Sequence, residues 1–222
     1  MERIETDGPR IRQSRRFEFF ALFVLAPIAM ATLLPPERMF LGLFVATALG
    51  LWLLHRTREF SWRDLGRGWN RIDWSSTAIF SLATTAVGVA VIQTTRPEAL
   101  FFLLREQPGL MMMIAILYPL VSVLPQELVF RPLFFERYQT LLPSGAWPAV
   151  VLNAALFSFA HLMYWSWIVV IMTFFGGLVF GWAYRIRGSF ALAVTLHSLG
   201  GIIIFALGLG LYFYSGNVQR PF

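Results

Sequence analysis

A series of long apolar runs constrains this sequence more than any other feature. The runs cover residues 19–34, 39–54, 74–93, 108–138, 147–162, 165–184 and 190–214. A helix that crosses a bilayer needs roughly 20 apolar residues, which most of these runs approach or supply. Only 14% of the 222 residues are charged, whereas soluble proteins carry about 25%. We therefore expect an all-α polytopic membrane protein.

The runs predict one integral membrane domain over residues 1–222, a bundle of about seven transmembrane helices. An eighth span or a re-entrant segment is left open. Ala29-Met30-Ala31 resembles a signal-peptidase site, so a cleaved signal peptide is an alternative to the retained anchor that we favour.

The arginines predict the orientation of the bundle. They cluster before the first run, between the second and third, after the fourth and after the sixth. All four places lie on one side if the N-terminus is cytoplasmic, as the positive-inside rule requires. We expect a prokaryotic plasma (inner) membrane, given the small size and this topology.

Residues 55–73 differ from the apolar runs on either side. Arginines alternate there with large apolar side chains, a mixture typical of an amphipathic segment that lies on the membrane surface. The residues concerned are Arg56, Arg58, Phe60, Trp62, Arg63, Leu65, Arg67, Trp69 and Arg71.

Composition excludes several classes of protein. The chain has no Cys, which rules out disulfides, Cys-ligated zinc and thiol catalysis. The net charge of +6 comes mostly from Arg in loops, so it indicates topology rather than nucleic-acid binding. The partner that composition predicts is the lipid bilayer, and the oligomeric state is left open.

Prolines interrupt the fourth run. Pro119, Pro125 and Pro132 each remove a backbone donor and disturb the preceding turn. Freed carbonyls inside a bilayer are tolerated where protein or a water-filled cavity satisfies them. We expect a kinked helix beside a cavity.

Four ionisable residues lie inside apolar runs: Glu127, Arg131, His161 and His197. Such groups are costly in a membrane and usually face the bundle interior. Glu127 and Arg131 are one helical turn apart and can pair. Any one of these residues alone is more often structural, but three helices that each contribute one favour a functional site.

Neighbouring positions extend this pattern. Asn153, Phe157 and His161 recur every four residues and share a helix face. Gln126 lies about 100° around the helix from Glu127, so the two side chains cannot both point at one target. Gly201, four residues after His197, allows another helix to approach closely.

Three segments resemble motifs of a known family. Gln126-Glu127-Leu128-Val129-Phe130-Arg131 resembles E-E-x-x-x-R, Phe157-Ser158-Phe159-Ala160-His161 matches F-x-x-x-H, and the segment from His197 to Gly201 resembles H-x-x-x-N or H-x-x-x-D. In this order on separate spans, they resemble the CPBP family of CAAX proteases and bacteriocin-processing enzymes, formerly called Abi. The resemblance covers about residues 108–205.

The resemblance implies an intramembrane endopeptidase that cleaves a membrane-associated peptide or a protein C-terminal tail. A Glu of the first motif would activate water with help from histidines, in a glutamic-type mechanism. It implies catalytic roles for Glu127, His161 and His197, with Arg131 orienting Glu127. Peptide hydrolysis needs such a base, together with donors for the oxyanion. Phe157, Asn153 and Gly201 would support the site.

Two positions depart from the family pattern. The usual catalytic Glu aligns with Gln126, which cannot accept a proton, and the Asn or Asp of the third motif aligns with Gly201. Three explanations remain open for Gln126. Glu127 acts as the base after a small helix rotation, the chain is a pseudo-protease that binds peptide or confers immunity without cutting, or Gln126 is a substitution that traps an enzyme.

Two further alternatives concern a metal and transport. Glu127, His161 and His197 match the ligand count of a catalytic zinc site, but no H-E-x-x-H is present and we expect no cofactor. A small transporter is less favoured, because transporters often contain repeated halves with paired broken helices, and only one proline-broken segment is present.

Overall fold

The structure is a computed structural model that describes residues 9–58, 60–66, 68–69, 72–218 and 220. These residues form helices and connecting loops, without a strand among them. The main elements are α1 (Pro9–Phe20), η1 (Ala21–Leu25), α2 (Ala26–Thr32), α3 (Met39–His55), α4 (Trp74–Thr95), α5 (Phe102–Glu106), α6 (Pro108–Tyr118), η6 (Pro119–Val123), α7 (Leu124–Leu128), η7 (Val129–Arg137), α8 (Ala146–Ala160), α9 (Trp167–Arg185), α10 (Phe190–Ala206) and α11 (Gly210–Phe213).

The prediction of a polytopic helical membrane protein is confirmed. Among the described residues, four helical segments are long and apolar enough to cross a membrane: Trp74–Thr95, Pro108–Arg137, Ala146–Tyr164 and Trp167–Arg185. Met39–His55 and Phe190–Ala206 are shorter apolar helices. The first predicted run lies in the helix α1–η1–α2, whose first half is charged. The number of spans therefore stays a prediction.

Helix α10 is shorter than the predicted run 190–214. It ends at Ala206, and Gly208 then adopts a left-handed φ of 92°. A side chain at Gly208 would overlap the Ala99 carbonyl oxygen. The chain turns there because only glycine combines this backbone conformation with so close a contact.

The predicted surface segment does not form a continuous helix. After α3 ends at His55, the described residues contain one short 3₁₀ turn, η3 (Trp62–Gly66). Phe60 packs against the core, whereas Trp62 is exposed. Arg67 and Arg71 lie outside the described residues. The position of this segment on a membrane surface stays a prediction.

Large apolar side chains cover the outer faces of α3, α4 and α6. Val45, Ile79, Leu82 and Met112 are each more than 60% exposed. Soluble monomers rarely expose so much apolar surface, and lipid satisfies it without cost. These faces therefore suit contact with the bilayer.

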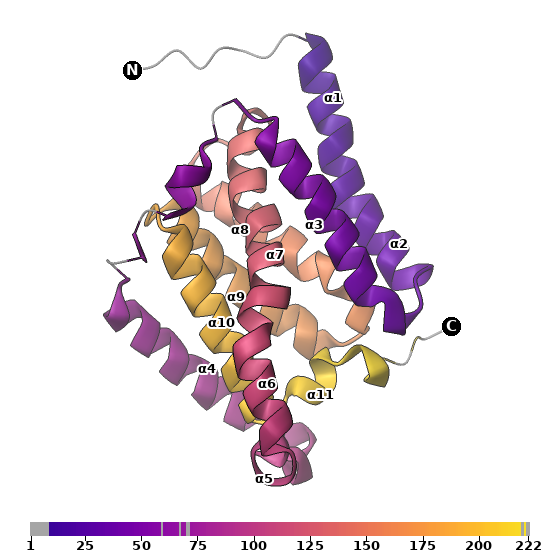
Figure 1. The fold of residues 1–222 in the computed structure, drawn as a ribbon, viewed down its shortest axis with the longest axis vertical. Coiled ribbons are helices and arrows are strands. Elements are labelled where there is room, and N and C mark those ends of the chain that lie inside the picture. The colour runs from indigo at the N-terminus through magenta and orange to yellow at the C-terminus, as the bar shows by residue number, and fades with distance from the viewer. Residues whose placement is uncertain (1–8, 59, 67, 70–71, 219, 221–222) are drawn as a thin grey trace.

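The helix from α6 to η7 runs through the middle of the molecule, with α5 at its lower end, α4 at the left edge and α1 at the right (Figure 1). Its upper part, η7, packs against α3, α8 and α9. Phe130 and Phe134 of η7 meet Phe23 of η1 edge to face, with ring centroids 5.5 and 5.3 Å apart. This aromatic core fixes the stretch that carries Glu127 and Arg131.

Polar contacts gather the four basic segments at one end of the bundle. Arg137 at the end of η7 pairs with Glu18 at 2.8 Å and donates to Thr57, after α3, at 3.3 Å. Arg187, after α9, pairs with Asp73 at 3.1 Å. Asp73 also caps α4, and the hydrogen bonds from Ser76 hold the pKa of its carboxyl below the usual value. This arrangement agrees with the predicted topology, while the orientation in a membrane stays a prediction.

Candidate functional site

Glu127 and Arg131 form an ion pair sealed inside the protein. Both side chains are 0% exposed. Arg131 donates from Nε to Glu127 Oε2 at 2.8 Å and from Nη2 to Oε1 at 3.2 Å. The one-turn spacing thus produces the predicted pair, in the two-pronged geometry that arginine favours with carboxylates.

Two more helices contribute to this pair. His197 of α10 donates from Nδ1 to Glu127 Oε1 at 2.9 Å. Arg131 Nη1 donates to Asn153 Oδ1 of α8, and Asn153 Nδ2 donates to the Phe130 carbonyl oxygen at 2.7 Å. We call Glu127, Arg131, Asn153 and His197 the buried network. It joins the central helix, which is the continuous stretch from α6 to η7, to α8 and α10.

Aromatic rings enclose the buried network. The guanidinium carbon of Arg131 lies 5.2 Å from the Phe157 ring centroid and 5.9 Å from that of Phe180. His197 stacks on Phe180 with a centroid distance of 4.6 Å. Ring faces attract the cation without admitting water. The rings thus surround an ion pair whose two side chains are both 0% exposed.

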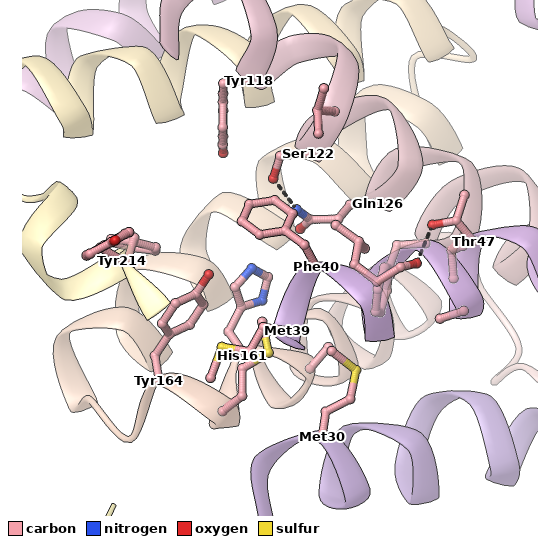
Figure 2. Close-up of a pocket in the computed structure, with 18 of the residues that line it drawn as sticks. Met30, Met39, Phe40, Thr47, Tyr118, Ser122, Gln126, His161, Tyr164 and Tyr214 are labelled. Carbon is pink, nitrogen blue, oxygen red and sulfur yellow. Dashed lines mark hydrogen bonds between the residues drawn. The ribbon is translucent and has the colours of Figure 1, made fainter. Parts of the chain in front are cut away.

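A separate cavity of about 460 Å³ lies beside it, bounded by α2, α3, the central helix, the turn η9 (Leu162–Tyr164) that follows α8, and α11. Most of its lining is apolar and includes four methionines, Met30, Met39, Met113 and Met163. Its polar side chains are Thr47, Tyr118, Ser122, Gln126, His161, Tyr164 and Tyr214 (Figure 2). The cavity confirms the expectation drawn from the prolines, because it opens along η6, the π-helical stretch that begins at Pro119.

Gln126 projects into this cavity (Figure 2). Its Nε2 donates to Ser122 Oγ at 2.9 Å. Its Oε1 is buried and has no hydrogen-bond partner among the described residues. Buried polar atoms are seldom left unpaired, and this one belongs to a side chain that lines the cavity.

His161 also lines the cavity, held by its own helix end. Its Nδ1 lies 2.7 Å from the Phe157 carbonyl oxygen. A carbonyl only accepts, so Nδ1 carries the proton and Nε2 of the neutral ring keeps a lone pair. The ring lies beside Tyr164, with centroids 6.1 Å apart. This arrangement presents a base to the cavity.

The structure divides the predicted site residues between the buried network and the cavity. The resemblance implied one catalytic site shared by Glu127, His161 and His197. His197 does meet Glu127, but His161 lies in the cavity that Gln126 lines and Glu127 does not. Neighbouring residues on a helix point about 100° apart, which sends Gln126 and Glu127 to different sides.

Phe157 forms the wall between the two places. Its ring centroid lies 4.7 Å from that of His161 and 5.6 Å from that of His197. His161 caps α8 in a non-helical conformation and so leaves the face on which Asn153 and Phe157 lie. Among the described residues, no three His, Cys, Asp or Glu side chains are grouped to hold a metal ion. The zinc set of Glu127, His161 and His197 therefore does not fit this geometry.

Sequence reasoning missed five polar residues of the cavity: Thr47, Tyr118, Ser122, Tyr164 and Tyr214. A pattern did exist, since Tyr118 and Ser122 precede Gln126 by eight and four residues on the same helix. Uncharged hydroxyls inside an apolar run attract less notice than ionised groups. Gly201, the eighth predicted residue, packs under the Tyr118 ring.

The fold contains helices long enough to cross a membrane, a buried ion-pair network and an adjoining cavity lined by Gln126 and His161. These features are those of a polytopic membrane protein with a polar site among its helices. Residues 107–203 match the family model of the type II CAAX prenyl endopeptidases, Rce1-like. The match spans α6 to α10 and includes all three motifs, which confirms the resemblance. The family description implies a peptidase with protein C-terminal substrates. No curated protein and no solved structure matched the chain.

Proposed function

We propose that this protein is an intramembrane endopeptidase that cleaves a membrane-associated peptide or C-terminal tail, with His161 as the base. The observation that carries the proposal is the placement of His161 in the cavity with Nδ1 held by the Phe157 carbonyl. That bond orients the ring and leaves Nε2 as the proton acceptor. The match to the CAAX endopeptidase family supports the same reaction class.

The placement of His161 supports a hydrolysis in two stages. His161 Nε2 takes a proton from water while the water oxygen bonds to the peptide carbonyl carbon, whose π electrons move to the carbonyl oxygen. When that electron pair returns, the carbon–nitrogen bond breaks and the proton on His161 passes to the leaving nitrogen. His161 ends neutral, and the products are a carboxylic acid and an amine.

Gln126 would position the attacking water. Its unpartnered Oε1 can accept a hydrogen bond from water, and Nε2 is already fixed by Ser122. Gln cannot take up the proton, so it leaves that step to His161. With Gln126 positioning the water and His161 accepting the proton, the chain would stay active without the family's Glu.

The buried network would act by positioning rather than by contact with substrate. Glu127 makes three hydrogen bonds to Arg131 and His197 and does not line the cavity. For Glu127 to act as the base, the helix would have to rotate and break all three bonds. We infer that Glu127, Arg131 and His197 hold the central helix so that Gln126 faces His161.

The test is cleavage of a quenched fluorescent peptide that ends in a farnesylated Cys-aliphatic-aliphatic-X tail, with the purified protein in proteoliposomes. We expect wild-type cleavage, its loss in His161→Ala, and equal or faster cleavage in Gln126→Glu, where a carboxylate adds a second base. His55→Ala is the matched control, because His55 is exposed at the end of α3. Unchanged cleavage after His161→Ala would refute the proposed base.

A second function, binding without cleavage, is favoured by Gln126 itself. An amide at the family's base position leaves the cavity intact but removes a proton acceptor. A pseudo-protease would retain the farnesylated peptide without cutting it and gain cleavage in Gln126→Glu. On either function we place the protein in a prokaryotic plasma membrane with a cytoplasmic N-terminus.

A further inference from the structure

Tyr118 and Gly201 occupy one shared space between α6 and α10. A Cβ added to Gly201 would meet Cε1, Cζ and Oη of the Tyr118 ring, all closer than 3.0 Å. Real Cβ atoms do not approach other atoms that closely. A side chain at position 201 and the Tyr118 ring in its present place therefore exclude each other.

This steric exclusion accounts for the glycine at position 201. The third motif carries Asn or Asp here, whereas this chain has no side chain at all. In its place stands the hydroxyl end of the Tyr118 ring, Cζ and Oη, contributed by another helix. The Tyr118 ring thus fills the space that a side chain at position 201 would need.

The Tyr118 hydroxyl is placed to act on a bound molecule. Figure 2 shows it pointing into the cavity that Gln126 and His161 line. It makes no hydrogen bond to any other residue that the structure describes. A tyrosine hydroxyl that faces a cavity can donate a hydrogen bond to a molecule bound there.

The ring is held firmly while its hydroxyl is free. Its centroid lies 6.2 Å from that of His197 and 5.7 Å from that of Phe205, both in edge-to-face contact. Tyr118 is also the last residue of α6, directly before the π-helical stretch η6. A donor fixed in this way needs no reorganisation when negative charge develops beside it.

We propose that Tyr118 is a further catalytic residue, whose hydroxyl donates a hydrogen bond to the carbonyl oxygen of the scissile peptide. The bond stabilises the oxyanion that forms when water, deprotonated by His161, adds to the carbonyl carbon. No proton leaves the tyrosine. The assignment rests on the proposed peptidase function, because it needs a peptide carbonyl in the cavity.

Tyr118→Phe tests the assignment in the farnesylated-peptide assay, since it removes the hydroxyl and keeps the ring. Loss of one oxyanion donor lowers kcat about 100-fold or more, and we expect KM to stay close to the wild-type value. Tyr212→Phe is the matched control, because Tyr212 of α11 does not line the cavity. It should cleave as the wild type does.

An exchange of the two positions tests the shared space. Gly201→Asn alone should reduce the amount of folded protein, because its side chain overlaps the Tyr118 ring. Tyr118→Ala alone should fold and lose activity. The double variant Tyr118→Ala/Gly201→Asn should recover folding relative to the first and cleavage relative to the second.

The outcomes separate this assignment from the function on which it rests. If the wild type cleaves and Tyr118→Phe has the wild-type kcat, the assignment is overturned and the peptidase function stands. A rise in KM with unchanged kcat also overturns it, because the hydroxyl would then bind substrate and transition state alike. A wild type that cleaves nothing overturns the peptidase function and this role together.

Discussion

Glu127 and Arg131 neutralise each other at the centre of the protein, where solvent reaches neither. Removing two charges from water is expensive and is offset only when every donor and acceptor is used. Asn153 and His197 complete that set by bonding to the guanidinium and the carboxylate. The pair therefore stabilises the fold only as long as it is intact.

Removal of one charge from this pair should be far more damaging than removal of an exposed one. Glu127→Ala leaves Arg131 buried without its counterion, which typically costs about 3–5 kcal/mol. We expect a large fall in thermal stability in detergent, or failure to accumulate folded protein. Glu98→Ala is the control, since Glu98 pairs with Arg96 at 3.5 Å on the surface, where such pairs contribute about 0–1 kcal/mol. Equal stability of the two variants would contradict the sealed network.

The central helix carries the cavity residues on one side and the buried network on another. Its π-helical stretches η6 and η7 contain Pro119 and Pro132, and π-helical turns are frequent at functional sites. The prolines and the four-residue spacing from Glu127 to Arg131 were enough to predict an irregular helix, a cavity and an ion pair. The irregular helix and the ion pair are local, so the sequence alone carries them.

Features that depend on contacts between helices could not be predicted in this way. His161 leaves its helix face because its N–H bonds to Ser158 three residues back, yet no Gly or Pro marks that helix end. The shared space of Tyr118 and Gly201 joins residues far apart in the chain, and each looks ordinary by itself. Only their packing shows that the Tyr118 ring occupies the space beside Gly201.

Close packing of α8 and α9 supports both the buried network and the cavity. Gly177 sets the distance between the two helices. A Cβ at Gly177 would lie 3.0 Å from the backbone Cα of Ala154, which cannot move aside as a flexible side chain would. We expect Gly177→Leu to force the helices apart and lower stability by about 1–3 kcal/mol, as overpacking usually does. Small residues serve this purpose widely in membrane helices.

The control for that substitution is Gly109→Leu, because nothing lies within 4 Å of a Cβ at Gly109. Thermal unfolding of both variants in the same detergent gives the comparison. A Gly177→Leu protein as stable as Gly109→Leu would show that α8 and α9 can separate freely.

At the scale of the whole molecule, the two ends of the bundle differ in charge. Arg137 and Arg187 tie the basic segments together through Glu18 and Asp73. The opposite end contains α5 and the close contact between Gly208 and Ala99. In a membrane, such an asymmetry directs the basic end to the cytoplasm.

Labelling of single cysteines measures this orientation directly, since the wild-type chain has none to give background. Arg63 lies at the basic end in the exposed turn η3, and Glu98 lies at the other end with an exposed side chain. Each of the two is replaced by Cys in a separate variant. In bacterial spheroplasts, a membrane-impermeant maleimide should label Glu98→Cys at once and Arg63→Cys only after lysis. The reverse pattern would place the N-terminus outside. Labelling of both in intact spheroplasts would mean that the two ends do not lie on opposite sides of the membrane.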